Sequence, residues 1–396
     1  MTTASIIRTL VPCLIAGAAF CADIPQVDIH GFVSQGYLKT NKNDYLGETQ
    51  SGTFDFNEAA VNLQSQLTSD LRVGVQLFAR DLDGIGQDRV AIDWAYADYH
   101  YRDELGIRFG QVKVARGLYN EYFDLDLANP TVLLPQSVYD ERLRDFLTST
   151  EGASVYGTLG SHQAGSLDYE VFCGTRSLDS NGSVAGFFRN AFYNKAAGQD
   201  YTSNSVTLRR MYGGSLTWNT PVRGLRANGS VLAFDHLEGS GTLTGYAPVP
   251  LPVTLDVSKG KNMVVGAEYT NNRLRLASEL TIWNLNYNYL STIGVSRWAG
   301  WYVQAAYQLT PKWEVAATYG EFYNDRLDRD GEHFSDPRQG FQKDTSLCLR
   351  YDPMSWMSIK AEGHYIRGWT QMFGQDNPNG FDGDTIMLAL KATVSF

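Results

Sequence analysis

The stretch TIMLALKATVSF, residues 385–396, decides the fold. Every second residue is apolar, from Ile386 to Phe396, whereas Thr385, Lys391 and Thr393 fall on the other parity. Alternation with a period of two places the apolar side chains on one face of a β-strand. The sequence therefore predicts a C-terminal strand with one apolar and one polar face, which ends on an aromatic residue.

Segments with the same alternation recur along the whole chain. Leu71, Val73 and Val75, for example, alternate with Arg72 and Gly74. Short turns and long polar loops separate the segments in turn, as they do in transmembrane barrels, whose strands come in even numbers. The sequence predicts an all-β fold, a transmembrane antiparallel β-barrel of about sixteen strands, within a range of about 14 to 18. The expected strands are residues 27–40, 53–67, 71–80, 89–101, 105–115, 152–159, 167–175, 206–218, 225–234, 262–270, 273–284, 298–309, 312–321, 344–351, 358–368 and 385–396.

The composition limits the classes of protein that the chain can belong to. It has 396 residues and a formal net charge of -10, so a nucleic-acid partner is excluded. Beyond the N-terminus no run of about 18 apolar residues occurs, which excludes a helical membrane protein. Aromatic residues make up 13% of the chain and there are 38 glycines, a mixture that suits aromatic girdles and glycine-rich turns.

Residues 1–22 are predicted to be a secretory signal peptide, and residues 23–396 a single barrel domain. Arg8 supplies the positive charge, and the apolar stretch 10–20 is too short to span a membrane. Cleavage after Ala19 places small residues before the cut, while cleavage after Ala22 leaves Phe20 at the third position before it. Both sites stay open.

The closing strand, with its terminal Phe396, resembles the C-terminal strand of Gram-negative outer-membrane β-barrels. In that family the terminal aromatic residue is part of the signal that the barrel-assembly machinery reads. The run FGQVKVARGLYNEYFD, residues 109–124, is similar to the approach to the third extracellular loop of trimeric porins and of phosphate-selective porin relatives. The resemblance implies a homotrimer in the cell outer membrane, in contact with lipid and lipopolysaccharide. It also implies passive diffusion of small hydrophilic solutes and ions.

The loop at residues 116–151 is the longest of the chain, and long loops in compact folds are usually functional. The resemblance implies that it is a long infolded constriction loop. Its acids are the candidate constriction residues, namely Glu121, Asp124, Asp126, Asp140, Glu141 and Asp145. The predicted basic residues of the pore wall are Arg72, Arg80, Arg108, Lys113, Arg116, Arg209, Arg275 and Arg350. Strand parity also places Lys360, Lys391, Glu268, Glu279 and Glu362 inside, and so many charges require a hydrated lumen.

Loop acids facing Arg72, Arg108 and Lys113 would set up a transverse field that orients polar solutes. In the alternative interpretation, these acids only solvate a loop or pair among themselves. The loop aromatics are open to two interpretations as well, a slide for sugars or a surface that docks the loop on the wall; they are Tyr119, Tyr122, Phe123 and Tyr139. A substrate-specific sugar or anion channel therefore stays an alternative, although the mixed charges argue against strict phosphate selectivity.

The sequence predicts no enzyme. The six histidines are scattered, none of them pairs with another at metal-ligand spacing, and hydrolase motifs are missing. His364 on the inward parity is the one residue that could act as a base, so an outer-membrane lipase or protease is the runner-up.

No cofactor is expected. Acids of the long loops, such as Asp328, Asp336 and Asp382, could bind Ca²⁺ or Mg²⁺ that bridges to lipopolysaccharide phosphates. They lack regular calcium-loop spacing, so solvated acids are the default interpretation.

Overall fold

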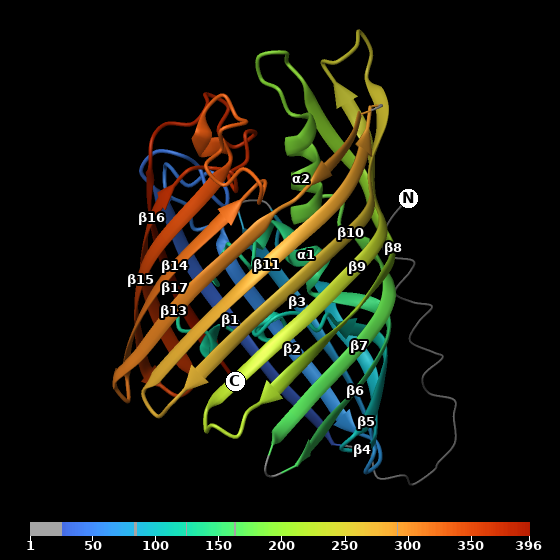
Figure 1. Cartoon of the computed structure of the whole chain (residues 1–396), viewed down its shortest axis with the longest axis vertical. Coiled ribbons are helices and arrows are strands. Elements are labelled where there is room, and N and C mark those ends of the chain that lie inside the picture. The colour runs from blue at the N-terminus through green and yellow to red at the C-terminus, as the bar shows by residue number, and fades with distance from the viewer. Residues whose placement is uncertain (1–25, 83–84, 124, 162–163, 291) are drawn as a thin grey trace, which may run out of the picture.

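The computed structural model describes residues 26–82, 85–123, 125–161, 164–290 and 292–396. The expected signal peptide, residues 1–22, lies outside this part of the chain. The described residues form one closed antiparallel β-barrel (Figure 1). Its strands are β1 (Val27–Thr40), β2 (Phe56–Gln66), β3 (Leu71–Leu82), β4 (Ala91–Arg102), β5 (Leu105–Lys113), β6 (Ser149–Ser161), β7 (Gly165–Leu178), β8 (Asp200–Asn219), β9 (Leu225–Thr244), β10 (Leu251–Thr270), β11 (Leu274–Tyr289), β12 (Thr292–Ser296), β13 (Ala299–Thr310), β14 (Trp313–Tyr323), β15 (Phe341–Met354), β16 (Met357–Arg367) and β17 (Thr385–Ser395).

The short strand β12 and the strand β13 occupy the same place in the wall, one after the other along β11. Both pair with β11, through Leu285↔Ser296 for β12 and Ile282↔Ala299 for β13. Together they make one spanning strand, so the described chain has sixteen such strands. The predicted sixteen-stranded barrel is confirmed.

The C-terminal strand closes the barrel against β1. The ladder runs from Phe32↔Ser395 to Thr40↔Met387, and the Phe396 amide donates to the Gly31 carbonyl over 2.9 Å. A side chain at Gly31 would meet the Phe396 ring, because its Cβ would lie 2.5 Å from the ring. Residue 31 therefore has to be glycine for the last residue to seal the wall in this way.

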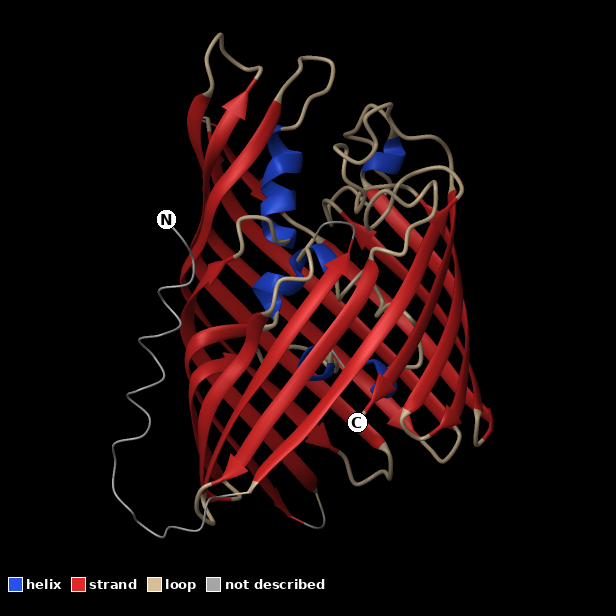
Figure 2. Cartoon of the chain, turned by 180° about the vertical axis from the view of Figure 1, so that it is seen from behind, coloured by secondary structure: helices blue, strands red, loops and turns tan. Residues whose placement is uncertain are grey.

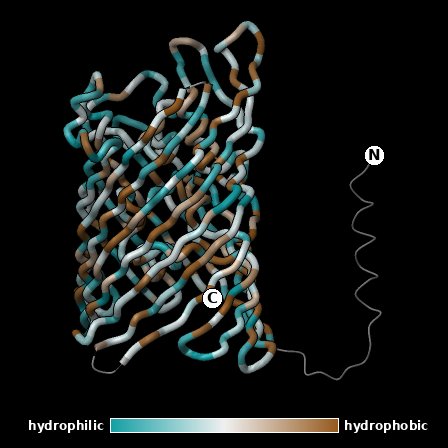
Figure 3. Tube along the Cα trace, turned by 45° about the vertical axis from the view of Figure 1, so that its right-hand side comes forward, coloured by the Kyte–Doolittle hydropathy of each residue, from teal (hydrophilic) through white to brown (hydrophobic). Residues whose placement is uncertain are grey.

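Alternating side chains give the wall two different faces, and the hydropathy changes from residue to residue along each strand (Figure 3). On β17, Lys391 and Thr393 are buried inside the barrel, whereas Ile386 and Leu388 are exposed outside. The outer face is rich in exposed apolar side chains, as expected of a barrel wall in lipid.

The wall has unequal height, because β8, β9 and β10 have 20 residues each and β5 has 9. The upper ends of β9 and β10 extend well beyond the expected bounds, 225–234 and 262–270. The extensions contain glycines and charges, such as Gly239, Gly241 and Asp256, which resemble loop sequence. They form strands because each extension pairs with the other over its full length.

Most of the helical pieces lie within the barrel (Figure 2). They are η2 (Asn120–Tyr122), η3 (Asp126–Ala128), η4 (Glu141–Leu143), α1 (Arg144–Leu147), α2 (Ser183–Phe192) and, in a loop near the rim, η5 (Pro337–Gln339). Val184 and Phe188 of α2 pack on the inner face of β8, against Val206 and Leu208. None of the helices in the described part of the chain is both long and apolar enough to cross a membrane.

Replacing Val265 with Arg should destabilise the barrel by about 2–4 kcal/mol, as expected for a cation at the bilayer midplane. Val265 is 51% exposed on the outer face of β10, midway between Lys261 and Thr270. Urea unfolding in lipid vesicles measures the effect. Val249→Arg, in the exposed loop between β9 and β10, is the control and should leave stability within about 0.5 kcal/mol. Equal stabilities of the two variants would contradict the lipid-facing assignment of β10.

Candidate functional site

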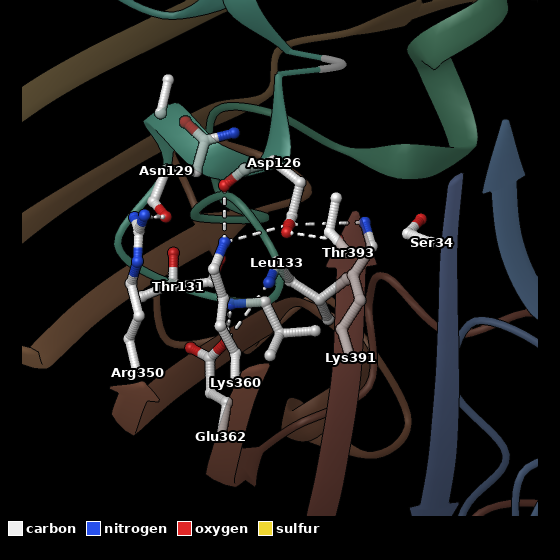
Figure 4. A network of polar contacts seen from close by, with 12 residues as sticks. Ser34, Asp126, Asn129, Thr131, Leu133, Arg350, Lys360, Glu362, Lys391 and Thr393 are labelled. Carbon is white, nitrogen blue, oxygen red and sulfur yellow. Dashed lines mark hydrogen bonds and ion pairs between the residues drawn. The ribbon is translucent and has the colours of Figure 1, made fainter. Parts of the chain in front are cut away.

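The segment 114–148 folds into the barrel and is held on three sides of the wall. On the first side, Lys360 of β16 is buried and its Nζ lies 2.9 Å from Asp126 Oδ1 (Figure 4). The same ammonium donates to the carbonyls of Asp126 and Thr131, over 2.6 and 3.1 Å. On β17, the Lys391 Nζ lies 3.5 Å from Asp126, and the Thr393 hydroxyl donates to it over 2.7 Å.

Burial raises the pKa of the Asp126 carboxyl, but the nearby charges of Lys360 and Lys391 outweigh it and hold that pKa well below its usual range. Asp126 is therefore a carboxylate at neutral pH. Its role in this arrangement is to fasten the loop to β16 and β17.

Further wall groups hold the loop backbone next to this ion pair. The carboxylate of Glu362 on β16 accepts from the amides of Val132 and Leu133, over 2.7 and 3.2 Å. Arg275 of β11 donates to the Ala128 carbonyl over 2.9 Å. Arg350 of β15 donates to the Asn129 carbonyl over 3.1 Å. Both arginines therefore point from the wall toward the infolded loop.

The second side of the wall uses Glu279 of β11 as a common acceptor. It accepts from the hydroxyls of Tyr139 and Tyr302, over 2.6 and 2.8 Å, and from the Leu118 amide over 2.8 Å. The Tyr119 hydroxyl donates to Glu268 over 2.6 Å. These loop tyrosines are buried against the wall, in agreement with the docking interpretation of the loop aromatics.

Arg116 lies at the start of the loop and is buried as well. Its Nε donates to Asn262 Oδ1 over 2.7 Å, and its Nη2 donates to the Val138 carbonyl over 3.0 Å. It thereby ties residues 116 and 138 of the loop to each other and to β10. Burial lowers the pKa of Arg116 from its ordinary value.

The third side of the wall uses Arg80 of β3, which contacts Glu141 over 2.8 Å and Asp145 over 3.1 Å. Burial raises the pKa of Glu141 in spite of Arg80. For Asp145, burial raises the pKa, but the charge of Arg80 and other favourable contacts outweigh burial. The pKa of Asp145 therefore lies below its usual range. Asp145 also accepts from the Ser183 amide over 2.8 Å, which joins the loop to the start of α2.

The structure corrects the predicted pairing of the loop acids with Arg72, Arg108 and Lys113. Asp126 docks on β16 and β17 instead, and Asp140 pairs with Arg142 of the same loop over 2.6 Å. Both carboxylates are buried, because each takes the cation nearest to the place where its segment docks.

The basic residues of the opposite wall have other partners. Arg72 pairs with Asp98 over 2.9 Å and Arg108 with Glu170 over 3.0 Å. Lys113 donates to the backbone carbonyl of Glu121 over 2.8 Å. Asp124 lies outside the described residues.

The placement of Arg209 on the pore wall is wrong. Arg209 is exposed on the outer face and contacts Glu238 over 3.0 Å, while its neighbour Leu208 is buried inside. Parity failed here because the apolar face of upper β8 packs inward on α2 rather than outward on lipid.

Two luminal cavities flank the loop. The cavity on the side of the long loops measures about 460 Å³ and is lined by Arg142, Arg189 and Phe373 among others. The one on the side of the short turns measures about 500 Å³. Its lining includes Arg108, Glu121, Tyr122, Tyr156 and Glu170. Glu121 is thus the predicted loop acid that borders an open space on the short-turn side.

No protein-family model matches the chain, and no curated protein sequence matches it either. Solved structures do. OmpF of Salmonella typhi, in complex with daunomycin, has a TM-score of 0.60 at 13% identity, covering 94% of this chain and 98% of that one. The outer membrane channel DcaP of Acinetobacter baumannii has a TM-score of 0.56 at 12% identity, covering 96% and 100%. The anion-selective porin from Comamonas acidovorans has a TM-score of 0.54 at 11% identity, covering 94% of this chain and 99% of that one.

The chain has the porin fold. At these identities the likeness establishes the architecture and leaves the solute open. The sixteen-stranded wall of this fold surrounds the loop described above.

The sequence predicts the position of the residues that anchor this loop, but not their role as anchors. Parity correctly placed Lys360, Glu279 and Glu362 inside the barrel, but gave no sign that they bind the loop. A buried lysine has the same sequence signal as a solvated one, and its partner Asp126 lies 234 residues away.

Proposed function

We propose that the chain is a Gram-negative outer-membrane porin, a channel for passive diffusion of small hydrophilic solutes and ions. The observation that carries this proposal is the loop at residues 114–148, pinned inside a sixteen-stranded barrel with a cavity on each side of it. Such a loop narrows the lumen, and a wall of paired charges keeps it wet. The proposal includes export across the inner membrane by a signal peptide.

We do not propose catalysis. The candidate base, His364, has its Nδ1 2.9 Å from Asp344 and its Nε2 3.5 Å from Glu362. Its side chain is buried, and the adjoining cavity measures about 20 Å³, room for about one water molecule. A substrate of a lipase or protease could not reach this histidine, so a part in the wall of the channel fits it better.

A homotrimer is part of the proposal. The part of the wall formed by β4 and β5, where the pairing between strands is incomplete, supports it. Strands β4 and β5 stop pairing at Ala95↔Gln111, although both continue beyond that point. A cavity of about 290 Å³ lies there, with Ile92 on the outer side and Arg80 and Arg144 on the inner side. Lipid is a poor cover for such charges, whereas another copy of the chain can supply polar groups. Native mass spectrometry in detergent tests the stoichiometry.

Planar-bilayer recording under a salt gradient tests the channel, and Glu121→Gln should shift the reversal potential toward anion preference. Glu121 borders the cavity on the short-turn side, and a carboxylate in a confined pore favours cations. The shift should be largest at low salt, because the Debye length is about 30 Å at 0.01 M and about 3 Å at 1 M.

Glu332→Gln, in the exposed loop after β14, is the charge-matched control and should leave the potential unchanged. A barrel that conducts no ions would refute the channel itself. Equal reversal potentials for Glu121→Gln and the unmodified chain at low salt would place the selectivity elsewhere on the wall.

A further inference from the structure

A group of charged side chains lies on the outer face of the barrel, away from the loop and the lumen. The outward-facing residues of β10 are first Val265 and Met263, which are exposed and apolar. Lys261 and Lys259 follow them toward the long loops. The charged group therefore begins where the apolar band ends. It covers the upper parts of the three longest strands, and its other members are Arg209, Arg210, Asp235, His236, Glu238 and Asp256.

Three members of this group bring potential metal ligands together. His236 Nδ1 lies 3.1 Å from Asp256 Oδ2 and 4.0 Å from Glu238 Oε1. One ligand atom from each of the three residues lies within 4.8 Å of the other two. All three side chains are partly exposed, so a solute can reach them from outside.

The strand register explains why these groups meet. Glu238 on β9 and Asp256 on β10 are directly paired across the ladder. Like charges directly opposite each other are destabilising, and a bound divalent cation would turn their repulsion into attraction. His236 adds a nitrogen ligand two residues before Glu238 on the same strand.

The ligand set is that of a divalent transition metal. Imidazole suits Zn²⁺, Cu²⁺, Ni²⁺ and Fe²⁺, whereas Ca²⁺ and Mg²⁺ prefer sites made of oxygen atoms alone. With metal–ligand bonds of about 2.0–2.2 Å, ligand atoms of a tetrahedral zinc site are separated by about 3.4 Å. The separations of 3.1 and 4.0 Å lie on either side of this value, so small side-chain adjustments suffice.

We propose that His236, Glu238 and Asp256 bind one divalent transition-metal ion of the Zn²⁺ class on the outer face of β9 and β10. Three protein ligands leave the fourth tetrahedral position to water or to an external group. The ion would join two strands above the apolar band and is independent of transport through the lumen.

A neighbouring side chain limits the affinity of this site. Arg209 of β8 contacts Glu238 over 3.0 Å and competes with an ion for its carboxylate. Arg210 carries the same charge but pairs with Asp235 over 3.2 Å, and Asp235 is not one of the three ligands. The two arginines therefore offer a matched comparison.

Cobalt and zinc titrations of the refolded barrel in detergent test the proposal. Co²⁺ should produce visible d–d absorption that saturates at one ion per chain, and Zn²⁺ should displace it. His236→Ala should weaken binding by at least about tenfold, since even groups that only support metal ligands contribute that much. Glu238→Gln should weaken it too, and heat-modified migration confirms that each variant is folded.

His333→Ala is the control. His333 Nδ1 lies 3.3 Å from Asp328 on an exposed loop, and within the described part of the chain His333 belongs to no group of three close metal-ligand side chains. It should leave the titration unchanged. Arg209→Met should tighten binding more than Arg210→Met, although both remove one positive charge. The proposal fails if the unmodified barrel binds no cobalt, if His333→Ala weakens binding as much as His236→Ala, or if the two arginine variants respond alike.

Discussion

Replacing Lys360 with Met should raise the single-channel conductance and lower the stability of the barrel. Methionine is unbranched and nearly as long as lysine, but it cannot neutralise Asp126 or donate to the loop carbonyls. Removing one partner of a buried ion pair costs about 3–5 kcal/mol, and we expect the lower end because Lys391 still lies 3.5 Å from Asp126. The segment 126–133 should then leave β16 and widen the lumen, which planar-bilayer recording measures directly.

The double variant Asp126→Asn with Lys360→Met separates the lost ion pair from a general packing defect. If the unpaired carboxylate causes the damage, the double variant should recover part of the stability that Lys360→Met loses. Lys312→Met, in the exposed turn before β14, is the control for a lost positive charge. Unchanged conductance of Lys360→Met would mean that the loop stays in place without this anchor.

Replacing Glu279 with Leu should lower the thermal stability of the loop even more strongly. The substitution leaves the hydroxyls of Tyr139 and Tyr302 and the Leu118 amide without their acceptor. Each buried donor that loses its partner costs about 1–3 kcal/mol, so the sum is several kcal/mol unless the loop moves into water. The near-ultraviolet circular dichroism of the tyrosines should lose intensity at a lower temperature than in the unmodified barrel.

Glu279→Gln should be much milder, because the amide oxygen can still accept from two donors. Glu104→Leu, in an exposed turn, should leave the melting temperature unchanged. A result in which the Leu and Gln variants melt alike would show that hydrogen bonding at residue 279 does not hold the loop.

The barrel was predictable from the sequence because its wall repeats one local rule. Alternation decides which side of a strand meets lipid, and a lipid-facing strand has to obey it at every second residue. The rule failed on upper β8, where Val206 and Leu208 face inward. There the apolar partner is α2, an element from a loop between strands, and alternation alone cannot distinguish a helix inside from lipid outside.

The site was less predictable, because its decisive contacts join distant segments without a repeating pattern. The sequence marks Asp126 and Asp140 as charged loop residues, and in most proteins such residues are solvated. Their burial follows from where the loop docks, which depends on Lys360, Glu279 and Arg80 on three different sides of the lumen. No local signal in 116–151 records those partners.

The short ladder between β4 and β5 sets how the barrel comes apart. A cylinder held by hydrogen bonds opens along its weakest seam. Among the described spanning strands, with β12 and β13 taken as one, this ladder is the shortest; it runs from Ala95↔Gln111 to Arg102↔Leu105. The ladder of β9 and β10, from Leu251↔Leu243 to Tyr269↔Leu225, is among the longest. Under heat or pulling force the wall should therefore tear between β4 and β5 and peel away from there, while the tall hairpin stays intact until last.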